Sequence, residues 1–234
     1  MRAVWTLVVV LAVLAGLAVV ADRVAVGIAE DRVAKEIKRS WKLSGDAEVD
    51  IKGFPFLTQV ASDRLDEVET TLHGMSARAG ERDLRLSELD ATFHSVRISG
   101  DYSSATAERA TGSATFSYAD LSKAAEDGVR VEYPGAERAR ENQVRVVVSL
   151  SLLGRSVERS VYSEVSVTGE NTVRFRADKV PGGSIPGLEQ AVRSRTDTSR
   201  KLSGLPKGLE LSDPKVTKDG VRVAGSGRDI SLSQ

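Results

Sequence analysis

The chain has 234 residues, with 33 basic and 33 acidic side chains, a formal net charge of +0 and no cysteine. The charge balance argues against nucleic acid as a partner, because nucleic-acid binding needs a basic surface. The lack of cysteine excludes disulfides, thiolate metal sites and a lipid anchor attached to cysteine.

The chain opens with an apolar run over residues 3–21 that contains no charged side chain. As a helix rising ~1.5 Å per residue, the run would extend ~28 Å, close to the ~30 Å apolar thickness of a bilayer. Arg2 and the terminal amine supply the positive flank that stays in the cytoplasm. We therefore expect residues 1–21 to be a signal anchor, or a signal peptide cleaved after Ala21, and residues 22–234 to form one extracytoplasmic domain.

An amphipathic helix is predicted over residues 22–41. Its apolar side chains recur at spacings of three and four, which places them on one face. These side chains are Val26, Ala29, Val33, Ile37 and Trp41. A Ser-Gly-Asp sequence at residues 44–46 ends the element.

Residues 53–59 form the most informative local motif, Gly-Phe-Pro-Phe-Leu-Thr-Gln. Pro55 fixes its own φ and pushes Phe54 toward an extended backbone, so the two phenylalanine rings project from a stiff turn. Two interpretations stay open. The rings plug the core beneath a sheet, or they form an apolar lip that touches acyl chains or a membrane surface.

From residue 47 onward the apolar period changes to two, which is typical of antiparallel strands with one wet and one dry face. The clearest alternation covers residues 144–152, 157–167 and 173–177. Earlier, residues 110–116 combine small side chains with one large ring on a single strand face. Its members are Ala110, Gly112, Ala114 and Phe116.

A long strand over residues 84–98 changes parity along its length. Leu89, Ala91 and Phe93 occupy odd positions, whereas Val96 and Ile98 occupy even ones. Because side chains alternate between the two faces of a strand, this change predicts a β-bulge that bends the strand.

The last third of the chain mixes a helix with short strands. Residues 181–186 break the alternation, residues 187–200 read as a second helix, and closing strands begin at Leu209. Asp219 and Gly220 form a tight turn between two of them. The whole pattern predicts an α+β fold.

Signals for catalysis are poor. His73 and His94 lie at unrelated spacing, and both read as ordinary strand residues rather than as metal ligands. Ser212 and Lys215 match a catalytic spacing, but that motif requires a helix and Pro214 opposes one. We therefore predict no enzyme activity, no metal and no cofactor.

Three segments resemble one known family. They are V-D-I-K-G-F-P-F-L-T-Q at residues 49–59, L-P-x-G-L-x-L at 205–211 and D-G-V-R-V at 219–223. Together with the N-terminal apolar segment and helix, they resemble the LmeA family of bacterial cell-envelope phospholipid-binding proteins. The resemblance covers nearly all of the chain after Ala21, and its most specific part is G-F-P-F-L-T-Q. Lys207 departs from it, because an apolar residue would be expected there.

The resemblance implies a TULIP-like fold, in which a long curved antiparallel sheet wraps around an amphipathic helix and leaves an elongated apolar groove. A phospholipid or a similar amphiphile is the expected partner, bound and possibly transferred outside the cytoplasm by a protein held in the cell membrane through residues 3–21. The residues expected to contact lipid are Phe54, Phe56 and Leu57 at the mouth, and Trp41, Phe93 and Phe116 along the groove. An envelope scaffold or protein-interaction domain with a solid core is the alternative.

Overall fold

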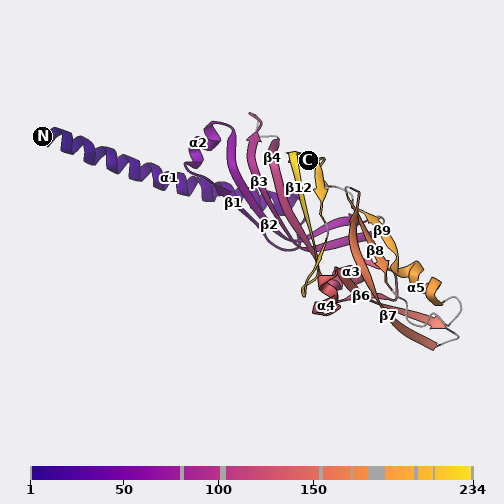
Figure 1. The fold of residues 1–234 in the computed structure, drawn as a ribbon. Helices are drawn as coiled ribbons and strands as arrows, with labels where there is room; N and C mark the ends of the chain where they lie inside the picture. Colours follow the sequence, from indigo (N-terminus) through magenta and orange to yellow (C-terminus); the bar gives the residue numbers. More distant parts are fainter. Residues whose placement is uncertain are drawn as a thin grey trace.

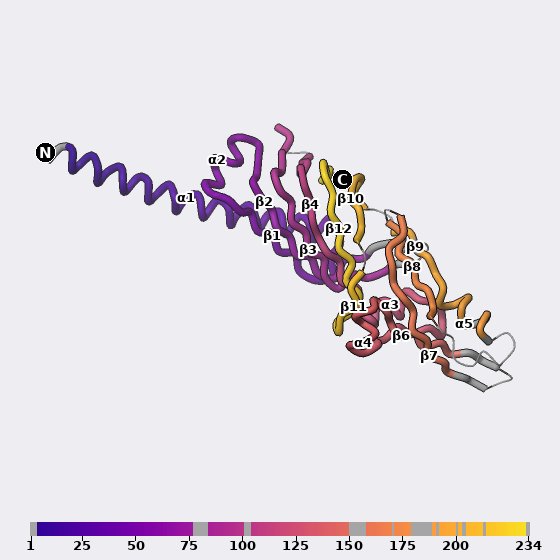
Figure 2. Tube along the Cα trace, in the orientation of Figure 1, coloured from indigo at the N-terminus to yellow at the C-terminus, as the bar shows by residue number. Residues whose placement is uncertain are grey.

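One helix, α1 (Arg2–Ser40), runs through both the apolar run and the amphipathic segment. The computed structural model describes residues 2–79, 82–100, 104–152, 155–169, 171–178, 188–202, 205–212 and 214–232. At ~1.5 Å per residue, the 39 residues of α1 extend ~58 Å. Figures 1 and 2 show the first half of this helix projecting alone from the rest of the chain. By length and composition, α1 is able to cross a membrane.

Two antiparallel sheets form the body of the protein. Sheet A has the strand order β1-β2-β3-β4-β12-β10, with β11 paired to β12, and sheet B has the order β5-β6-β7-β8-β9. The strands of sheet A are β1 (Ala47–Lys52), β2 (Arg64–Ala79), β3 (Arg82–Ile98), β4 (Ala105–Phe116), β10 (Leu209–Leu211), β11 (Lys215–Val216) and β12 (Val221–Ser231). Those of sheet B are β5 (Val129–Glu132), β6 (Gln143–Leu152), β7 (Arg155–Thr168), β8 (Thr172–Ala177) and β9 (Thr198–Lys201).

Four short helices complete the described structure: α2 (Phe56–Ala61), α3 (Tyr118–Ala124), α4 (Ala136–Arg140) and α5 (Leu188–Thr196). The α5 helix confirms a second helix within the predicted residues 187–200, but it ends at Thr196, and residues 198–200 belong to β9 instead. The predicted break at residues 181–186 lies outside the described residues. The α+β class is confirmed, and the long N-terminal helix with large antiparallel sheets is consistent with a TULIP-like fold (Figure 1).

The second half of α1 meets sheet A at the β1 edge. It packs mainly against β1 and α2. The Glu30 carboxylate accepts a hydrogen bond of 2.8 Å from the Ile51 backbone N–H. The helix thereby satisfies a backbone donor of the edge strand, which would otherwise be open to pairing with another chain.

Strand β3 changes parity without gaining a residue. His94 pairs with Glu67 and Val96 pairs with Leu65, so the register is the same on both sides of Ser95. Ser95 has a φ of 51°, in the left-handed region. The predicted β-bulge is therefore wrong, because a bulge would place two residues opposite one.

The same distortion recurs in another strand of the sheet. Asp229 in β12 has a φ of 50° and, like Ser95, lies between pairs to β4 that keep their register. Since the two strands that flank β4 turn at one level, side chains of opposite parity reach the same face. Phe93 and Val96 accordingly both pack in one cluster with Val26 of α1.

The described core consists of two apolar clusters. The α1 cluster joins the helix to one end of sheet A, and its buried members are Val26, Ile51, Phe56, Leu65, Val96 and Ala107. The inter-sheet cluster joins the other end of sheet A to sheet B, and its fully buried members include Val144, Val148, Val161, Val165 and Val192. Sheet A therefore connects both cores through its long strands.

The predicted turn at Asp219 and Gly220 is confirmed between β11 and β12. Val216 pairs with Val221 across it, and the Thr217 N–H donates to the Gly220 carbonyl at 2.8 Å. Gly220 has a φ of 153°, and a Cβ added there would lie 2.1 Å from the Phe116 carbonyl oxygen. The turn therefore packs too closely on β4 for any side chain.

Substitution of Gly220 by Ala should destabilise the protein by more than ~2 kcal/mol, because backbone has to move to admit the methyl group. Gly27→Ala is the matched control, since a Cβ there meets no atom within 4 Å and lies in a helix. That control should be neutral or stabilising by up to ~1 kcal/mol. Chemical denaturation of both variants checks this, and equal midpoints would show that the turn is not packed as described.

Candidate functional site

The strand register places a set of apolar side chains on one face of sheet A. Directly paired residues point to the same face of a sheet, so the pairings assign each side chain. We define the apolar face by three cross-strand rows. The first row contains Ile51, Val68, Phe93, Ala110, Gly227 and Leu209. The second contains Val49, Thr70, Ala91, Gly112, Gly225 and Leu211, and the third Ala47, Leu72, Leu89, Ala114 and Val223.

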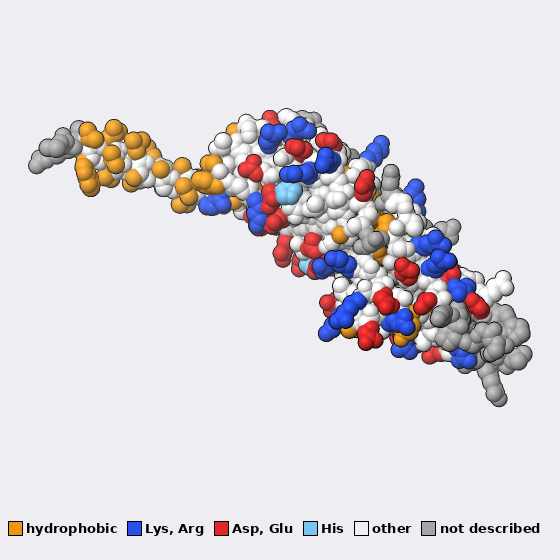
Figure 3. All heavy atoms as spheres, in the orientation of Figure 1, with side chains coloured by type: hydrophobic (Ala, Val, Ile, Leu, Met, Phe, Trp, Pro, Cys, Tyr) orange, Lys and Arg blue, Asp and Glu red, His pale blue; other side chains and the backbone are white. Residues whose placement is uncertain are grey.

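The opposite face of the same strands is polar. One row there contains Asp50, Glu69, Thr92, Thr111, Ser226 and Glu210. Figure 3 shows that the visible side of the domain carries interspersed acidic and basic side chains, while hydrophobic side chains cover the projecting helix. The sheet thus has one wet side and one side that needs an apolar cover.

The centre of the apolar face is lined by small residues and is only partly covered. Ala91, Gly112 and Gly225 are direct neighbours in the second row, and all three are half-buried. The larger side chains beside them, Leu89 and Phe93, are half-buried too. Side chains beneath a fully packed layer would be buried, so this face keeps apolar surface available to a ligand.

The apolar stripe of α1 is also incompletely covered. Val26 is buried in the α1 cluster, whereas Val33, two turns further along the same stripe, is 43% exposed. Trp41 follows the end of the helix and is 44% exposed. The amphipathic helix predicted for residues 22–41 therefore buries its beginning and leaves its end open.

A cavity of about 110 Å³ lies between the two sheets. Its apolar lining includes Leu84, Phe116, Val129, Val146, Val173 and Val223. Because Val223 also belongs to the third row, the cavity adjoins the apolar face. Ligand pockets usually measure ~300–1,000 Å³, so this cavity has room for only part of an acyl chain.

The Phe-Pro-Phe motif divides between the core and the surface. Phe56, the first residue of α2, is buried in the α1 cluster. Phe54 and Leu57 are 58% and 49% exposed. Phe56 therefore packs in the core, as one interpretation of the motif expects, while Phe54 is exposed and its contact with lipid stays a prediction.

The six residues expected to contact lipid lie in several places. Phe56 and Phe93 belong to the α1 cluster, with Phe54 and Leu57 beside Phe56 in sequence. Phe116 lines the inter-sheet cavity. Trp41 lies at the far end of α1, and Lys207, the departure from the family pattern, is exposed. The apolar face of sheet A connects the environments of Phe93 and Phe116.

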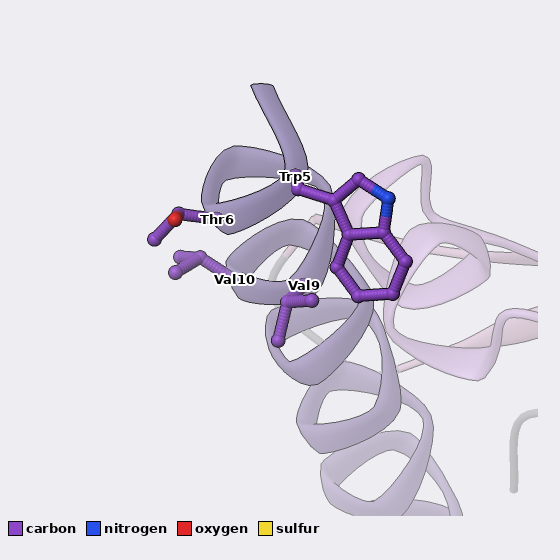
Figure 4. Close-up of a pocket in the computed structure, with 4 residues that line it drawn as sticks. All are labelled: Trp5, Thr6, Val9 and Val10. Atoms are coloured by element: carbon purple, nitrogen blue, oxygen red, sulfur yellow. The ribbon is translucent and has the colours of Figure 1, made fainter. Parts of the chain in front are cut away.

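A second hollow lies on α1 itself, beside Trp5 (Figure 4). It is lined by Trp5, Thr6, Val9 and Val10, which all belong to the helix. The hollow is thus a surface depression between side chains of the apolar run, and it is not part of a ligand cavity between the helix and the sheets.

Asp22 is a structural residue that the sequence analysis missed. Its side chain is 3% exposed, and its carboxylate accepts hydrogen bonds from the Leu57 N–H at 2.8 Å and from the Arg23 guanidinium at 2.9 Å. Desolvation opposes ionisation, but the Leu57, Arg23 and Phe56 donors outweigh it and lower the pKa of Asp22. The carboxylate therefore caps the N-terminus of α2, for which Pro55 provides no side-chain cap.

Asp22→Asn should lower the thermal stability of the full chain at neutral pH, because the amide keeps the geometry and loses the charge. The folded-state pKa lies below the ordinary value of 3.8, so this stabilisation is present above that value and is lost as the pH falls through the folded pKa. The difference in melting temperature between wild type and variant should thus shrink in acid.

Asp31→Asn is the control for this titration, since the Asp31 side chain is 78% exposed. Its ion pair with Lys35 is long, at 4.0 Å between Oδ2 and Nζ, and contributes little stability. It should change the melting temperature little at any pH. A difference for Asp22→Asn that stays constant into acid would contradict the assigned role of the carboxylate.

Comparison with known proteins gives one match. The family described as LmeA-like phospholipid-binding matches residues 20–226, which is most of the chain. Neither the curated proteins nor the solved structures yield a significant match. The match includes the Phe-Pro-Phe motif, the strands β1 to β4 and β10, the first part of β12, and the second half of α1. The chain belongs to the LmeA-like phospholipid-binding family.

Proposed function

We propose that the protein binds a phospholipid with an acyl chain laid along the apolar face of sheet A. Membership of a lipid-binding family supports lipid as the partner, and it describes a binding protein rather than a class of enzyme. The observation that carries the proposal is the row Ala91, Gly112 and Gly225, which is apolar, small and half-buried. Transfer of the lipid and a location outside the cytoplasm are parts of the same proposal.

The energetics of such binding depend on the cover that the protein gives the acyl chain. Each methylene that leaves water gains ~0.8 kcal/mol, but a lipid in the bilayer already has that gain. A carrier can take lipid from a membrane only if its own surface is equally dry. The sheet face covers one side of the tail, and the open end of the α1 stripe would cover the other.

The apolar face is long enough for a fatty tail. Along β3, the half-buried residues from Phe93 to Leu89 cover ~13 Å at ~3.3 Å per residue, and Leu86 and Leu84 beyond them are buried in the inter-sheet cluster. One leaflet of the bilayer core is ~15 Å thick, so a single tail is about as long as this half-buried stretch. The tail would enter near Phe56 and Phe93 and point toward Phe116 and the inter-sheet cavity.

The lipid-contacting residues are assigned on the same basis. Phe54 and Leu57 are exposed beside the Phe93 end of the face, where they would form the entrance. Phe93 and Phe116 would line the path, with Phe56 supporting the entrance from below. Trp41 would cover the tail from the open end of the α1 stripe.

We further propose that residues 1–21 are retained as a membrane anchor and that residues 22–234 form a single lipid-binding domain. The unbroken helix from Arg2 to Ser40 supports this proposal, because the apolar run continues into the domain without a linker. Cleavage after Ala21 is the alternative. N-terminal sequencing of the protein purified from membranes distinguishes the two.

An envelope scaffold without a ligand is the second candidate function. The small cavity between the sheets favours it, since about 110 Å³ is less than an ordinary ligand pocket. In this case the half-buried face would be covered by a protein partner. The two candidates differ in whether lipid accompanies the purified chain.

Native mass spectrometry of the full chain, extracted under mild conditions, tests the proposal. We expect a co-purifying phospholipid mass on the wild type. Ala91→Asp should reduce the lipid-bound fraction at least ~10-fold, because a carboxylate under an acyl chain carries a desolvation cost of several kcal/mol.

Thr92→Asp is the matched control, since it places the same charge one residue away on the wet face. It should retain lipid as the wild type does, and thermal unfolding of both variants should show that they fold. Wild-type protein without lipid would favour the scaffold. Equal lipid retention by the two variants would show that the lipid does not bind on the apolar face.

A further inference from the structure

Apolar side chains surround α1 at the point where the helix enters the domain. Phe54 and Leu57 lie on the side of α2, where Asp22 contacts the Leu57 N–H. On the opposite side of α1, Val24 and Ile28 are 57% and 49% exposed. At 3.6 residues per turn, these two positions face away from Asp22 and from the buried Val26. We call these four exposed residues, Val24, Ile28, Phe54 and Leu57, the collar.

The two charges at this level of the helix are paired with each other, and the Arg23 side chain is 49% exposed whereas that of Asp22 is 3% exposed. Asp22 is buried under α2, where it accepts the Leu57 N–H. The guanidinium of Arg23 contacts the Asp22 carboxylate, lies 3.4 Å from the Gly53 carbonyl oxygen, and stacks 5.2 Å from the centre of the Phe54 ring. Two charges that would end a membrane span are thus paired and partly shielded.

The length of the apolar segment places the collar relative to the bilayer. Residues 3–21 cover the ~30 Å hydrocarbon core. Each headgroup region adds ~5–7 Å, which is the length of ~4–5 helical residues. Val24 therefore falls at the depth of the headgroups, and Ile28, one turn further along α1, lies at their outer edge. The next charge after Arg23 is Glu30, whose carboxylate accepts the Ile51 N–H.

We propose that the collar docks into the interfacial layer of the bilayer that holds residues 3–21. This inference rests on the proposed function in one respect, the retention of the N-terminal segment. The bilayer is the occupant because the collar continues the apolar surface of the spanning helix without a gap. Phenylalanine and leucine are also the types that interfacial segments bury in this layer, and the half-exposed Arg23 can reach lipid phosphate there.

Docking through the collar fixes how the domain stands on the membrane. Phe56 lies beside the exposed Phe54 and Leu57 and shares the α1 cluster with Phe93. The Phe93 end of the apolar face therefore lies next to the membrane, and the inter-sheet cavity lies away from it. A lipid tail would pass from the bilayer onto the sheet without crossing water.

The lack of native cysteine allows a direct test on the full chain. Single variants Val24→Cys, Leu57→Cys and Ser226→Cys would each carry a nitrobenzoxadiazole label, after reconstitution into vesicles of equal parts phosphatidylethanolamine and phosphatidylglycerol. Labels at positions 24 and 57 should show blue-shifted emission and quenching by brominated lipid. The label at Ser226, on the wet face, should show neither.

The pair of collar positions separates bilayer contact from contact with a carried lipid. A lipid bound on the sheet can reach position 57 but not position 24, which faces away from the domain. Quenching at 57 without quenching at 24, or a label at 57 as wet as the one at 226, would overturn the inference. If lipid co-purifies but the collar labels stay in water, the docking proposal fails and the proposed lipid binding is retained. If the collar labels enter the bilayer but the protein carries no lipid, the proposed lipid binding fails and the docking proposal is retained.

Discussion

The register of sheet A is the constraint on which the rest of the structure depends. Because side chains alternate along a strand, a slip of one residue would move every apolar group of that strand to the wet face. The pairing across β1, β2, β3, β4 and β12 avoids such a slip even where Ser95 and Asp229 adopt positive φ. One apolar face therefore extends from the α1 cluster to the inter-sheet cluster.

Much of this architecture could be predicted from local sequence patterns. Alternation identified the strands, and it placed Ala110, Gly112 and Ala114 on one face, which the pairings confirm. The sequence also shows the parity change after Phe93, but a positive φ at Ser95 causes it, rather than the predicted β-bulge. A single strand cannot show whether its neighbours are distorted at the same level, and that decides between a bulge and a shared kink.

The features that the sequence did not predict are all long-range. Asp22 caps a helix that begins 34 residues later, and no local spacing connects it with Leu57. The division of the strands into two sheets depends on which strands pair, and short apolar runs do not specify that. The exposure of Phe54 beside the buried Phe56 depends on where α1 packs, so the motif alone left both interpretations open.

The small residues of the apolar face have both a structural and a functional consequence. Glycine inside a strand costs stability, because it packs no side chain and loses more entropy on folding. At Gly112 the cost has a backbone reason, since an added Cβ would lie 2.6 Å from the Asp90 carbonyl oxygen. At Gly225 an added Cβ would lie 3.3 Å from the nearest atom, the Glu210 carbonyl oxygen, so the backbone restricts the residue type less there than at Gly112.

At Ala91, which already carries a Cβ, a solid scaffold would be more stable with a larger side chain, because each buried methylene adds ~0.8 kcal/mol. The sheet instead combines the shallow centre of its apolar face with half-buried Leu89 and Phe93. This combination leaves folding free energy unrealised until another apolar surface covers the face. A lipid tail fits that role better than a rigid protein surface, since its flexible chain adapts to a narrow row of small residues. The α1 helix, unbroken from the apolar run to the α1 cluster, holds this uncovered face beside the collar.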